Sequence, residues 1–150
     1  MIKIEVAYHR MNSDGNLTRC YRTIWSLCGA TTIHLVSSKA QLRKRYLFSA
    51  KDKHSIIQYR DLSSFFATNK NKQIIIFETN GKKGLSEFKK DNIRKDVIVL
   101  LFGGESDTIP LKPYRGYNRY RIETANRLCL INDVVTGITL YTVMMRLKNG

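Results

Sequence analysis

The chain contains short runs of apolar residues whose lengths are typical of strands in an α/β protein. The clearest is Val97–Phe102, an apolar run rich in β-branched residues that is too short for a helix and ends at Gly103-Gly104. Such a run predicts a central strand buried on both faces of a sheet. The pattern predicts further strands over residues 2–8, 31–36, 55–60 and 73–77, and a strand-like start to residues 121–131.

Apolar residues at helical spacing separate these strands. They predict helices over about 16–28 and 38–50, a short helix capped by Asp61, and a C-terminal helix that ends near Leu147. The first and last helices carry apolar stripes, which consist of Leu17, Tyr21, Ile24 and Cys28, and of Val134, Ile138, Tyr141 and Met145. Strands that alternate with helices predict an α/β fold in which helices flank a mostly parallel sheet.

The charge balance is strongly basic, with 26 Lys and Arg against 12 Asp and Glu and a formal net charge of +14. This excess predicts a polyanionic partner, with nucleic acid the leading candidate and a merely solvated basic face the alternative. At 43–46 and 112–120 basic residues have aromatic neighbours, which suits a surface that holds phosphates while rings contact bases or riboses. The candidate RNA-binding residues are Arg19, Arg43, Lys44, Arg45, Lys112, Arg115 and Arg119.

Other classes of protein lack support in the sequence. No phosphate-binding GxxxxGK[ST] loop occurs, no GxGxxG follows the first strand, and His9, His34 and His54 are scattered, so each histidine is expected to be structural or solvated. The three cysteines lack metal-ligand spacing, so reduced thiols and no metal are expected. A length of 150 residues without a membrane-length apolar stretch predicts a single cytoplasmic domain over 1–150.

The end of the predicted central strand is a candidate ligand site. Gly103-Gly104 is followed by Glu105, and ligands of open α/β sheets bind where buried strands end in glycine turns. An ordinary strand exit with a tight turn is the alternative interpretation of this stretch alone.

Three segments together resemble one known family. Residues 16–23, reading NLTRCYRT and followed by Gly29-Ala30, resemble the first motif of the SpoU/TrmH family of RNA ribose methyltransferases in the SPOUT superfamily. Residues 101–110, LFGGESDTIP, are similar to its second motif, and residues 129–141, CLINDVVTGITLY, to its third. Residues 78–88 are similar to the segment that precedes the second motif. The resemblance covers nearly the whole chain in the family's order.

The resemblance implies a fold, a reaction and an assembly. The fold would be an α/β domain whose C-terminal part forms a trefoil knot, with no appended RNA-binding domain. The reaction would be methyl transfer from S-adenosyl-L-methionine to a ribose 2′-hydroxyl of tRNA or rRNA. The protein would act as a homodimer whose interface is built largely from the first and last helices.

The resemblance also implies site residues. Arg22 would orient the target phosphate and stabilise the developing alkoxide, because a guanidinium stays protonated and is a poor base. Asn16, Glu105 and Asn132 would complete the catalytic site. The backbone of three turns would hold the cofactor, at Thr79, Asn80, Gly81, Phe102, Gly103, Gly104, Ile122, Cys129 and Leu130.

The chain departs from the family pattern at several positions. Thr18 and Thr108 replace motif glycines, and Ile131 stands where an asparagine is usual, with Asn132 one place later. Either a local shift of the chain lets the Asn132 side chain make the polar contact of the usual asparagine, or that contact is lost. Two alternatives therefore stay open, which are a catalytically lapsed SPOUT-fold RNA-binding protein and a nucleotide-binding α/β domain of unrelated function.

Overall fold

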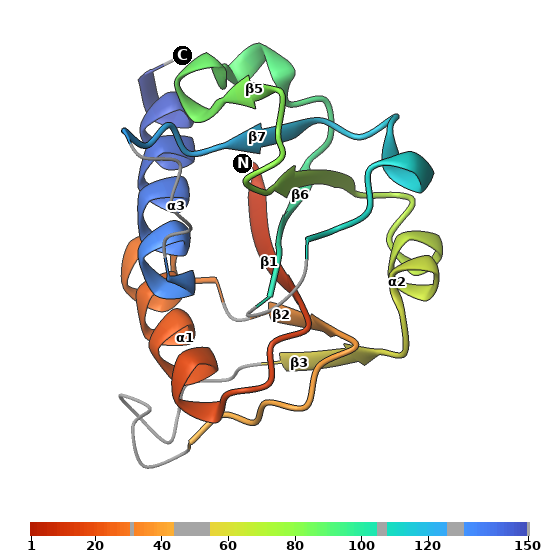
Figure 1. Ribbon diagram of the computed structural model, residues 1–150. Coiled ribbons are helices and arrows are strands. Elements are labelled where there is room, and N and C mark those ends of the chain that lie inside the picture. Colours follow the sequence, from red (N-terminus) through yellow and green to blue (C-terminus); the bar gives the residue numbers. More distant parts are fainter. Residues whose placement is uncertain (31, 44–54, 105–107, 126–130, 150) are drawn as a thin grey trace.

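A computed structural model describes residues 1–30, 32–43, 55–104, 108–125 and 131–149 (Figure 1). Within these residues seven strands form one sheet in the order β3-β2-β1-β6-β4-β7-β5, and all of the paired strands are parallel. The strands are β1 Lys3–His9, β2 Thr32–Val36, β3 Ser55–Tyr59, β4 Gln73–Phe77, β5 Lys83–Gly84, β6 Val97–Phe102 and β7 Arg119–Arg121. The predicted α/β fold with a mostly parallel sheet is confirmed.

Helices cover both faces of the sheet. Helices α1 (Asp14–Cys28) and α3 (Asn132–Asn149) lie side by side on one face, and α2 (Leu62–Thr68) lies on the other (Figure 1). Helix α1 begins where it does because the Ser13 hydroxyl accepts a hydrogen bond from the Asn16 amide at 3.2 Å. Asp61 caps α2 in the same way through the Ser64 amide, as predicted. None of the helices within the described residues is long and apolar enough to span a bilayer.

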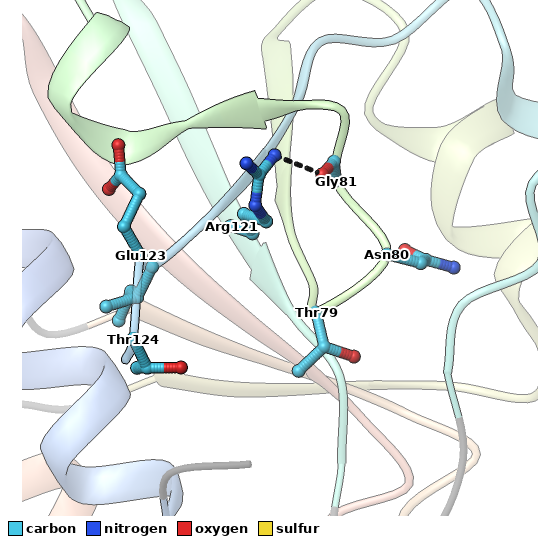
Figure 2. Close-up of a pocket in the computed structure, with 7 residues that line it drawn as sticks. Thr79, Asn80, Gly81, Arg121, Glu123 and Thr124 are labelled. Carbon is cyan, nitrogen blue, oxygen red and sulfur yellow. Dashed lines mark hydrogen bonds between the residues drawn. The ribbon is translucent and has the colours of Figure 1, made fainter. Parts of the chain in front are cut away.

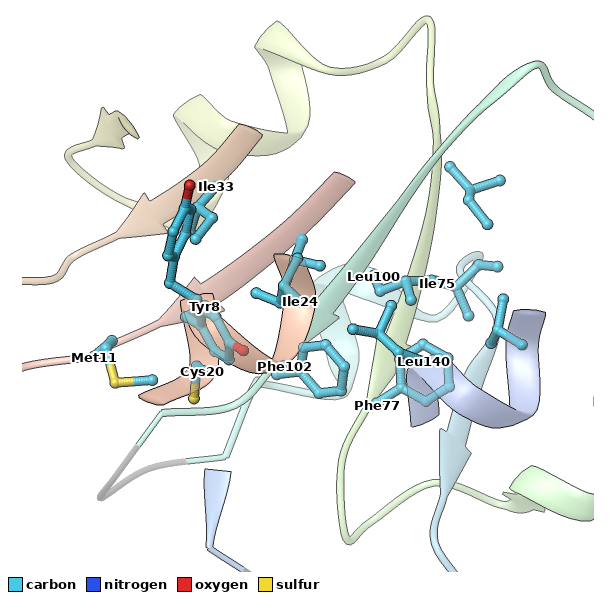
Figure 3. Packing of buried hydrophobic residues seen from close by; sticks show 14 of the residues in the cluster. Tyr8, Met11, Cys20, Ile24, Ile33, Ile75, Phe77, Leu100, Phe102 and Leu140 are labelled. Carbon is cyan, nitrogen blue, oxygen red and sulfur yellow. The ribbon is translucent and has the colours of Figure 1, made fainter. Parts of the chain in front are cut away.

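The central strand β6 is buried on both faces, as its unbroken apolar run predicts. Leu100 and Phe102 pack with residues of α1 and α3 on one face (Figure 3), whereas Val99 and Leu101 pack with residues of α2 on the other. The stripe of α1 is core, since Leu17, Tyr21 and Ile24 are fully buried. The stripe of α3 is not core, because its four residues are 38 to 59% exposed.

A buried polar network joins the first three strands to the segment before β4. The Glu5 carboxylate is 3% exposed and lies 2.7 Å from His34 Nε2, 2.8 Å from Lys72 Nζ and 3.1 Å from Lys3 Nζ. The other ring nitrogen of His34 lies 2.9 Å from the Tyr59 hydroxyl. Burial raises the pKa of Glu5, but these hydrogen bonds outweigh it and leave the pKa at about 2.

The predicted basic helix over 38–50 is wrong in its described part, because residues 38–43 are not helical; the remainder lies outside the described residues. The reason is competition from side chains of the preceding loop and α1. They bind three backbone amides of the segment, namely Lys39 (to Asn12 Oδ1, 3.1 Å), Gln41 (to Asp14 Oδ1, 2.8 Å) and Arg43 (to Thr18 Oγ1, 3.1 Å).

The strand expected at the start of 121–131 lies earlier, at β7 (Arg119–Arg121). Its place is fixed by pairing with β4, since the amides of Ile76 and Glu78 donate to the carbonyls of Asn118 and Tyr120 at 2.9 Å each. A three-residue strand is too short to show a periodic pattern of its own.

The network around Glu5 predicts a loss of stability in acid. The carboxylate stabilises the fold above pH 4.5, its unperturbed pKa, and this contribution is lost as the pH falls from 4.5 towards 2. Glu5→Gln should lower the free energy of unfolding at pH 7 by about 3 kcal/mol, because His34 and Lys72 lose their buried partner. Urea denaturation of both proteins between pH 7 and pH 3 measures this.

The matched control is Asp91→Asn, which alters an exposed carboxylate. It should leave the acid dependence of stability unchanged. Equal acid sensitivity of the wild type and Glu5→Gln would contradict the assignment of the stabilising charge to Glu5.

Candidate functional site

The carboxyl ends of the parallel strands meet at one edge of the sheet, and a pocket opens there. It has a volume of about 400 Å³ and lies between the turn that follows β4 and the segment that follows β7 (Figure 2). Such a volume falls within the range of small-molecule sites. The pocket is lined by Thr79, Asn80, Gly81, Arg121, Ile122, Glu123 and Thr124.

Two charged side chains hold the walls of this pocket together. Arg121 Nη1 donates to the carbonyl oxygens of Gly81 at 2.9 Å and Lys82 at 2.8 Å, which ties β7 to the turn after β4 (Figure 2). The Glu123 carboxylate accepts hydrogen bonds from the hydroxyl and the amide of Ser86. The Asn80 side chain points away from Arg121 and accepts from Arg119, so Asn80 offers the pocket mainly its backbone.

The Glu78 carboxylate links the ends of β4 and β6. Its Oε1 accepts from the Ile109 amide at 2.9 Å, and burial raises the pKa of this carboxyl. A Cβ atom at Gly103 would collide with the Glu78 carboxylate, and one at Gly104 with the backbone of His9. Packing inside the protein therefore already requires both glycines, which the sequence alone had suggested to be needed for close approach of a ligand.

An amide chain joins three distant segments beside this turn. Asn16 Nδ2 donates to Asn132 Oδ1 at 3.0 Å, and Asn132 Nδ2 donates to the Gly103 carbonyl at 3.1 Å. Asn16 belongs to α1, Gly103 follows β6, and Asn132 opens α3. Ile131 is 65% exposed, whereas the side chain of its neighbour Asn132 makes both of these polar contacts.

Other residues predicted for the site also belong to α1. Arg22 is exposed, and Arg19 Nε lies 3.6 Å from Asp133 Oδ2, which adds a contact between α1 and α3. Thr18 is buried, where its hydroxyl donates to the Asp14 carbonyl at 2.7 Å and accepts from the Arg43 amide. Thr18 thus has a structural use that a glycine could not provide.

The predicted basic loop divides into buried and exposed residues. Arg119 is 9% exposed, and its guanidinium donates to Asn80 Oδ1 at 2.9 Å, the Ile109 carbonyl at 2.8 Å and the Pro110 carbonyl at 2.9 Å. We therefore assign Arg119 a structural role and omit it from the candidate RNA surface. Lys112 and Arg115 are exposed.

The aromatic residues of that loop pack inward. The rings of Tyr114 and Tyr117 lie 4.3 and 4.5 Å from the ring of Phe66, and Tyr120 is 1% exposed. Tyr114 and Tyr117 thus hold the loop on α2, and Tyr120 packs against Phe77 and Phe88, so the expectation that these rings contact bases has no support in the structure.

Five predicted site residues lie outside the described residues. They are Lys44, Arg45, Glu105, Cys129 and Leu130.

Several residues that shape the pocket were not among the site residues predicted from the sequence. Arg121, Glu123 and Thr124 line it, and Glu78 supports it from below the strand ends. The only available signal was their position directly after predicted strands, since loops at the carboxyl ends of parallel strands form ligand sites.

No protein-family model matches this sequence, and no curated protein matches it. Solved structures do match. One was reported for the 2-OH methylation of C/U34 on tRNA (16% identical, 99% of both chains, TM-score 0.79). Another is a TrmH/SpoU tRNA modifying enzyme of A. aeolicus (16% identical, 99% of this chain and 77% of that chain, TM-score 0.77).

A third is an AdoMet-bound rRNA methyltransferase from Sinorhizobium meliloti (24% identical, TM-score 0.76), which covers 97% of this chain while this chain spans 57% of it. Together these likenesses show that the chain has the fold of SpoU/TrmH methyltransferases, so the resemblance of its motifs is confirmed at the level of the fold.

The contacts of Arg119 predict that it stabilises the protein. Arg119→Met should lower the free energy of unfolding by about 2 kcal/mol, because it leaves the Ile109 and Pro110 carbonyls without their donor. Urea denaturation measures this. Arg115→Met, at an exposed position of the same loop, should change stability by less than about 0.5 kcal/mol. Equal stability of the two variants would refute the structural role.

Proposed function

We propose that this protein is an S-adenosyl-L-methionine-dependent RNA methyltransferase that methylates a ribose 2′-hydroxyl of tRNA or rRNA. The single observation that carries the proposal is the amide chain from Asn16 through Asn132 to Gly103, which joins the three motif segments beside a pocket. The fold shared with RNA methyltransferases supports the same conclusion.

The pocket after β4 and β7 suits the cofactor. Four of the residues that the resemblance assigns to the cofactor, Thr79, Asn80, Gly81 and Ile122, line it together. Peptide groups of these turns can hydrogen-bond an adenosine and an amino-acid moiety, since residues 79–80 and 122–124 lie outside the strands. When bound there, S-adenosylmethionine would supply an electrophilic methyl group.

Positioning is the main task of the protein in such a reaction. The Asn132 amide fixes the Gly103 turn against α1, so the cofactor turn and the helix that carries Arg22 keep one geometry. Arg22 is exposed to an incoming strand, and its guanidinium would bind the phosphate next to the target ribose and stabilise the developing negative charge. We keep Glu105 as a further proposed member of this site.

The RNA surface would begin at the amino-terminal end of α1. The guanidinium groups of Arg19 and Arg43 approach there, since a Cβ atom on Gly15 would lie 3.5 Å from Arg19 Nη1 and 4.0 Å from Arg43 Cζ. Both side chains are exposed and lie near Asn16. Lys112 and Arg115 would extend the surface beyond α2, and the net charge of +14 favours binding of the phosphate backbone.

The structure favours an active enzyme over a lapsed one. Two of the departures that motivated the lapsed interpretation have a local explanation, because the Asn132 side chain makes polar contacts that Ile131 could not make and the Thr18 hydroxyl binds the Arg43 amide. Thr108 is exposed and fills no part of the described pocket.

We also propose a homodimer and a knot. The dimer is supported by the apolar stripe of α3 (Val134, Ile138, Tyr141 and Met145), which has no cover among the described residues and would be buried by a second copy. The trefoil knot is supported by the contact of Asn132, at the start of α3, with the Gly103 turn, as expected where the C-terminal segment passes a loop.

Methyl transfer is the direct test of the proposed function. The protein should transfer label from methyl-labelled S-adenosylmethionine to total tRNA or rRNA, and the label should survive mild alkaline hydrolysis as a dinucleotide because a 2′-O-methyl group blocks cleavage. Binding of S-adenosylhomocysteine is measured in parallel by calorimetry. Absence of label in the RNA together with absence of cofactor binding would refute the proposed methyltransferase activity.

The matched variants for this assay are Arg22→Ala and Arg146→Ala, which both remove an exposed arginine from a helix. Arg22→Ala should reduce methylation by at least 100-fold and leave S-adenosylhomocysteine affinity unchanged. Arg146→Ala should leave both unchanged. Loss of cofactor binding and of folding in Arg22→Ala would assign Arg22 to structure instead.

The exposed stripe predicts a dimer that a single charge can break. Tyr141→Glu should convert the dimer to a monomer in sedimentation velocity, because Tyr141 is 59% exposed and lies in the middle of the stripe. Arg146→Glu, off the stripe on the same helix, should remain dimeric. A wild-type protein that is monomeric at all concentrations would contradict the proposed interface.

A further inference from the structure

The carboxylate of Glu78 lies between two of the turns that we assign to the cofactor. Glu78 directly follows β4, and the next three residues, Thr79, Asn80 and Gly81, line the pocket. Its carboxylate packs on Gly103 at the end of β6, since a Cβ atom at Gly103 would collide with it. Glu78 is not among the residues that line the pocket, so any effect it has on a ligand there passes through these turns.

The same carboxylate binds the Ile109 peptide, which is anchored in the core. The Ile109 side chain is fully buried in the cluster that packs with α2. Its amide donates to Glu78 Oε1 at 2.9 Å, and its carbonyl accepts from Arg119 Nη1 at 2.8 Å. The same Arg119 atom also donates to Asn80 Oδ1 at 2.9 Å. The turn after β4 is thus tied to Ile109 at two of its residues, Glu78 and Asn80.

These contacts do not make Glu78 a source of stability at neutral pH. Burial raises the pKa of this carboxyl above 4.5, and the amides of Ile109 and Thr79 and the charge of Arg119 offset burial only in part. The other groups that face it, at Gly103, Ile109 and Thr79, carry no charge. Because the folded-state pKa is the higher one, ionisation of Glu78 lowers the free energy of unfolding as the pH rises above 4.5. A charge that lowers stability beside a pocket indicates a role in binding or catalysis.

We propose that Glu78 is a positioning residue whose charged carboxylate holds the turns at Thr79 and Gly103 in the arrangement that binds S-adenosylmethionine. The inference rests on the proposed methyltransferase function and adds the group that keeps two of the cofactor turns together. The charge matters because a carboxylate is a stronger acceptor of amide hydrogen bonds than a neutral group is. Loss of the charge should therefore weaken cofactor binding without unfolding the protein.

The test compares Glu78→Gln and Glu78→Leu with the wild type by calorimetry with S-adenosylhomocysteine. Glutamine keeps an acceptor without the charge, whereas leucine removes both. The affinity at pH 7.5 should fall by about 5-fold in Glu78→Gln and by about 20-fold in Glu78→Leu, in line with the strength of hydrogen bonds to charged groups. The melting temperature of Glu78→Gln should equal or exceed that of the wild type, because this variant removes a charge that burial disfavours.

A pH series separates this role from simple packing. The wild-type affinity for S-adenosylhomocysteine should fall as the pH is lowered through the raised pKa of Glu78, and Glu78→Gln should show no such fall. In the wild type without ligand, the NMR resonance of the Ile109 amide should shift over the same pH range, since this amide donates to the titrating carboxylate. The shift should be absent from Glu78→Gln.

The matched control is Glu87→Gln, because the Glu87 carboxylate also accepts from a backbone amide, that of Gly84 at 2.6 Å. This variant should keep the wild-type affinity and its pH dependence. Wild-type affinity in Glu78→Gln, or a loss of affinity matched by a fall in its melting temperature, would overturn the positioning role. A wild type that binds no S-adenosylhomocysteine would instead refute the proposed function itself.

Discussion

One side-chain amide links the elements on which the rest of the site depends. Asn132 accepts a hydrogen bond from Asn16 and donates one to the Gly103 carbonyl, so its two ends are used on two different elements. The amide has an acceptor and a donor at a fixed separation, and therefore it fixes both neighbours at once. Helix α1, the end of β6 and the start of α3 are aligned by this contact.

The loops around the pocket have little regular secondary structure. Polar side-chain contacts hold them in place instead. Arg119, Arg121 and Glu78 each bind backbone groups of another segment; Arg119 begins β7, Arg121 ends it, and Glu78 directly follows β4. Charged side chains in such places are satisfied by carbonyls and amides that no strand uses. These contacts therefore fix the relative positions of the segments that surround the pocket in the structure.

Some of the basic residues bind groups inside the fold, whereas others are exposed on the surface. Lys72 belongs to the network of Glu5, and Arg119 is enclosed by carbonyl oxygens, so neither is free to meet a phosphate. Arg19 and Arg43 are exposed and converge near Gly15. The surface relevant to RNA is therefore smaller and more localised than the count of basic residues indicates.

Local pattern was sufficient for most of the fold. The run Val97–Phe102 identified the central strand, and Asp61 identified the start of the helix that it caps, because burial on a strand and capping of a helix depend on neighbours in sequence. The order of the three motif segments could also be recognised in the sequence, and it predicted the α/β fold that the structure has. Position after a strand was enough to select Gly103, whereas Gly81 was selected through the family resemblance.

Long-range contacts decided the rest. The contacts of Asn132 with Asn16 and Gly103, and the burial of Arg119 beside the exposed Arg115, both depend on groups far away in sequence. The segment 38–43 is not helical for the same reason, since side chains of the loop before α1 and of α1 itself bind its amides. Periodicity reports which face of an element is apolar, whereas the partner of a polar group is known only once the chain has folded.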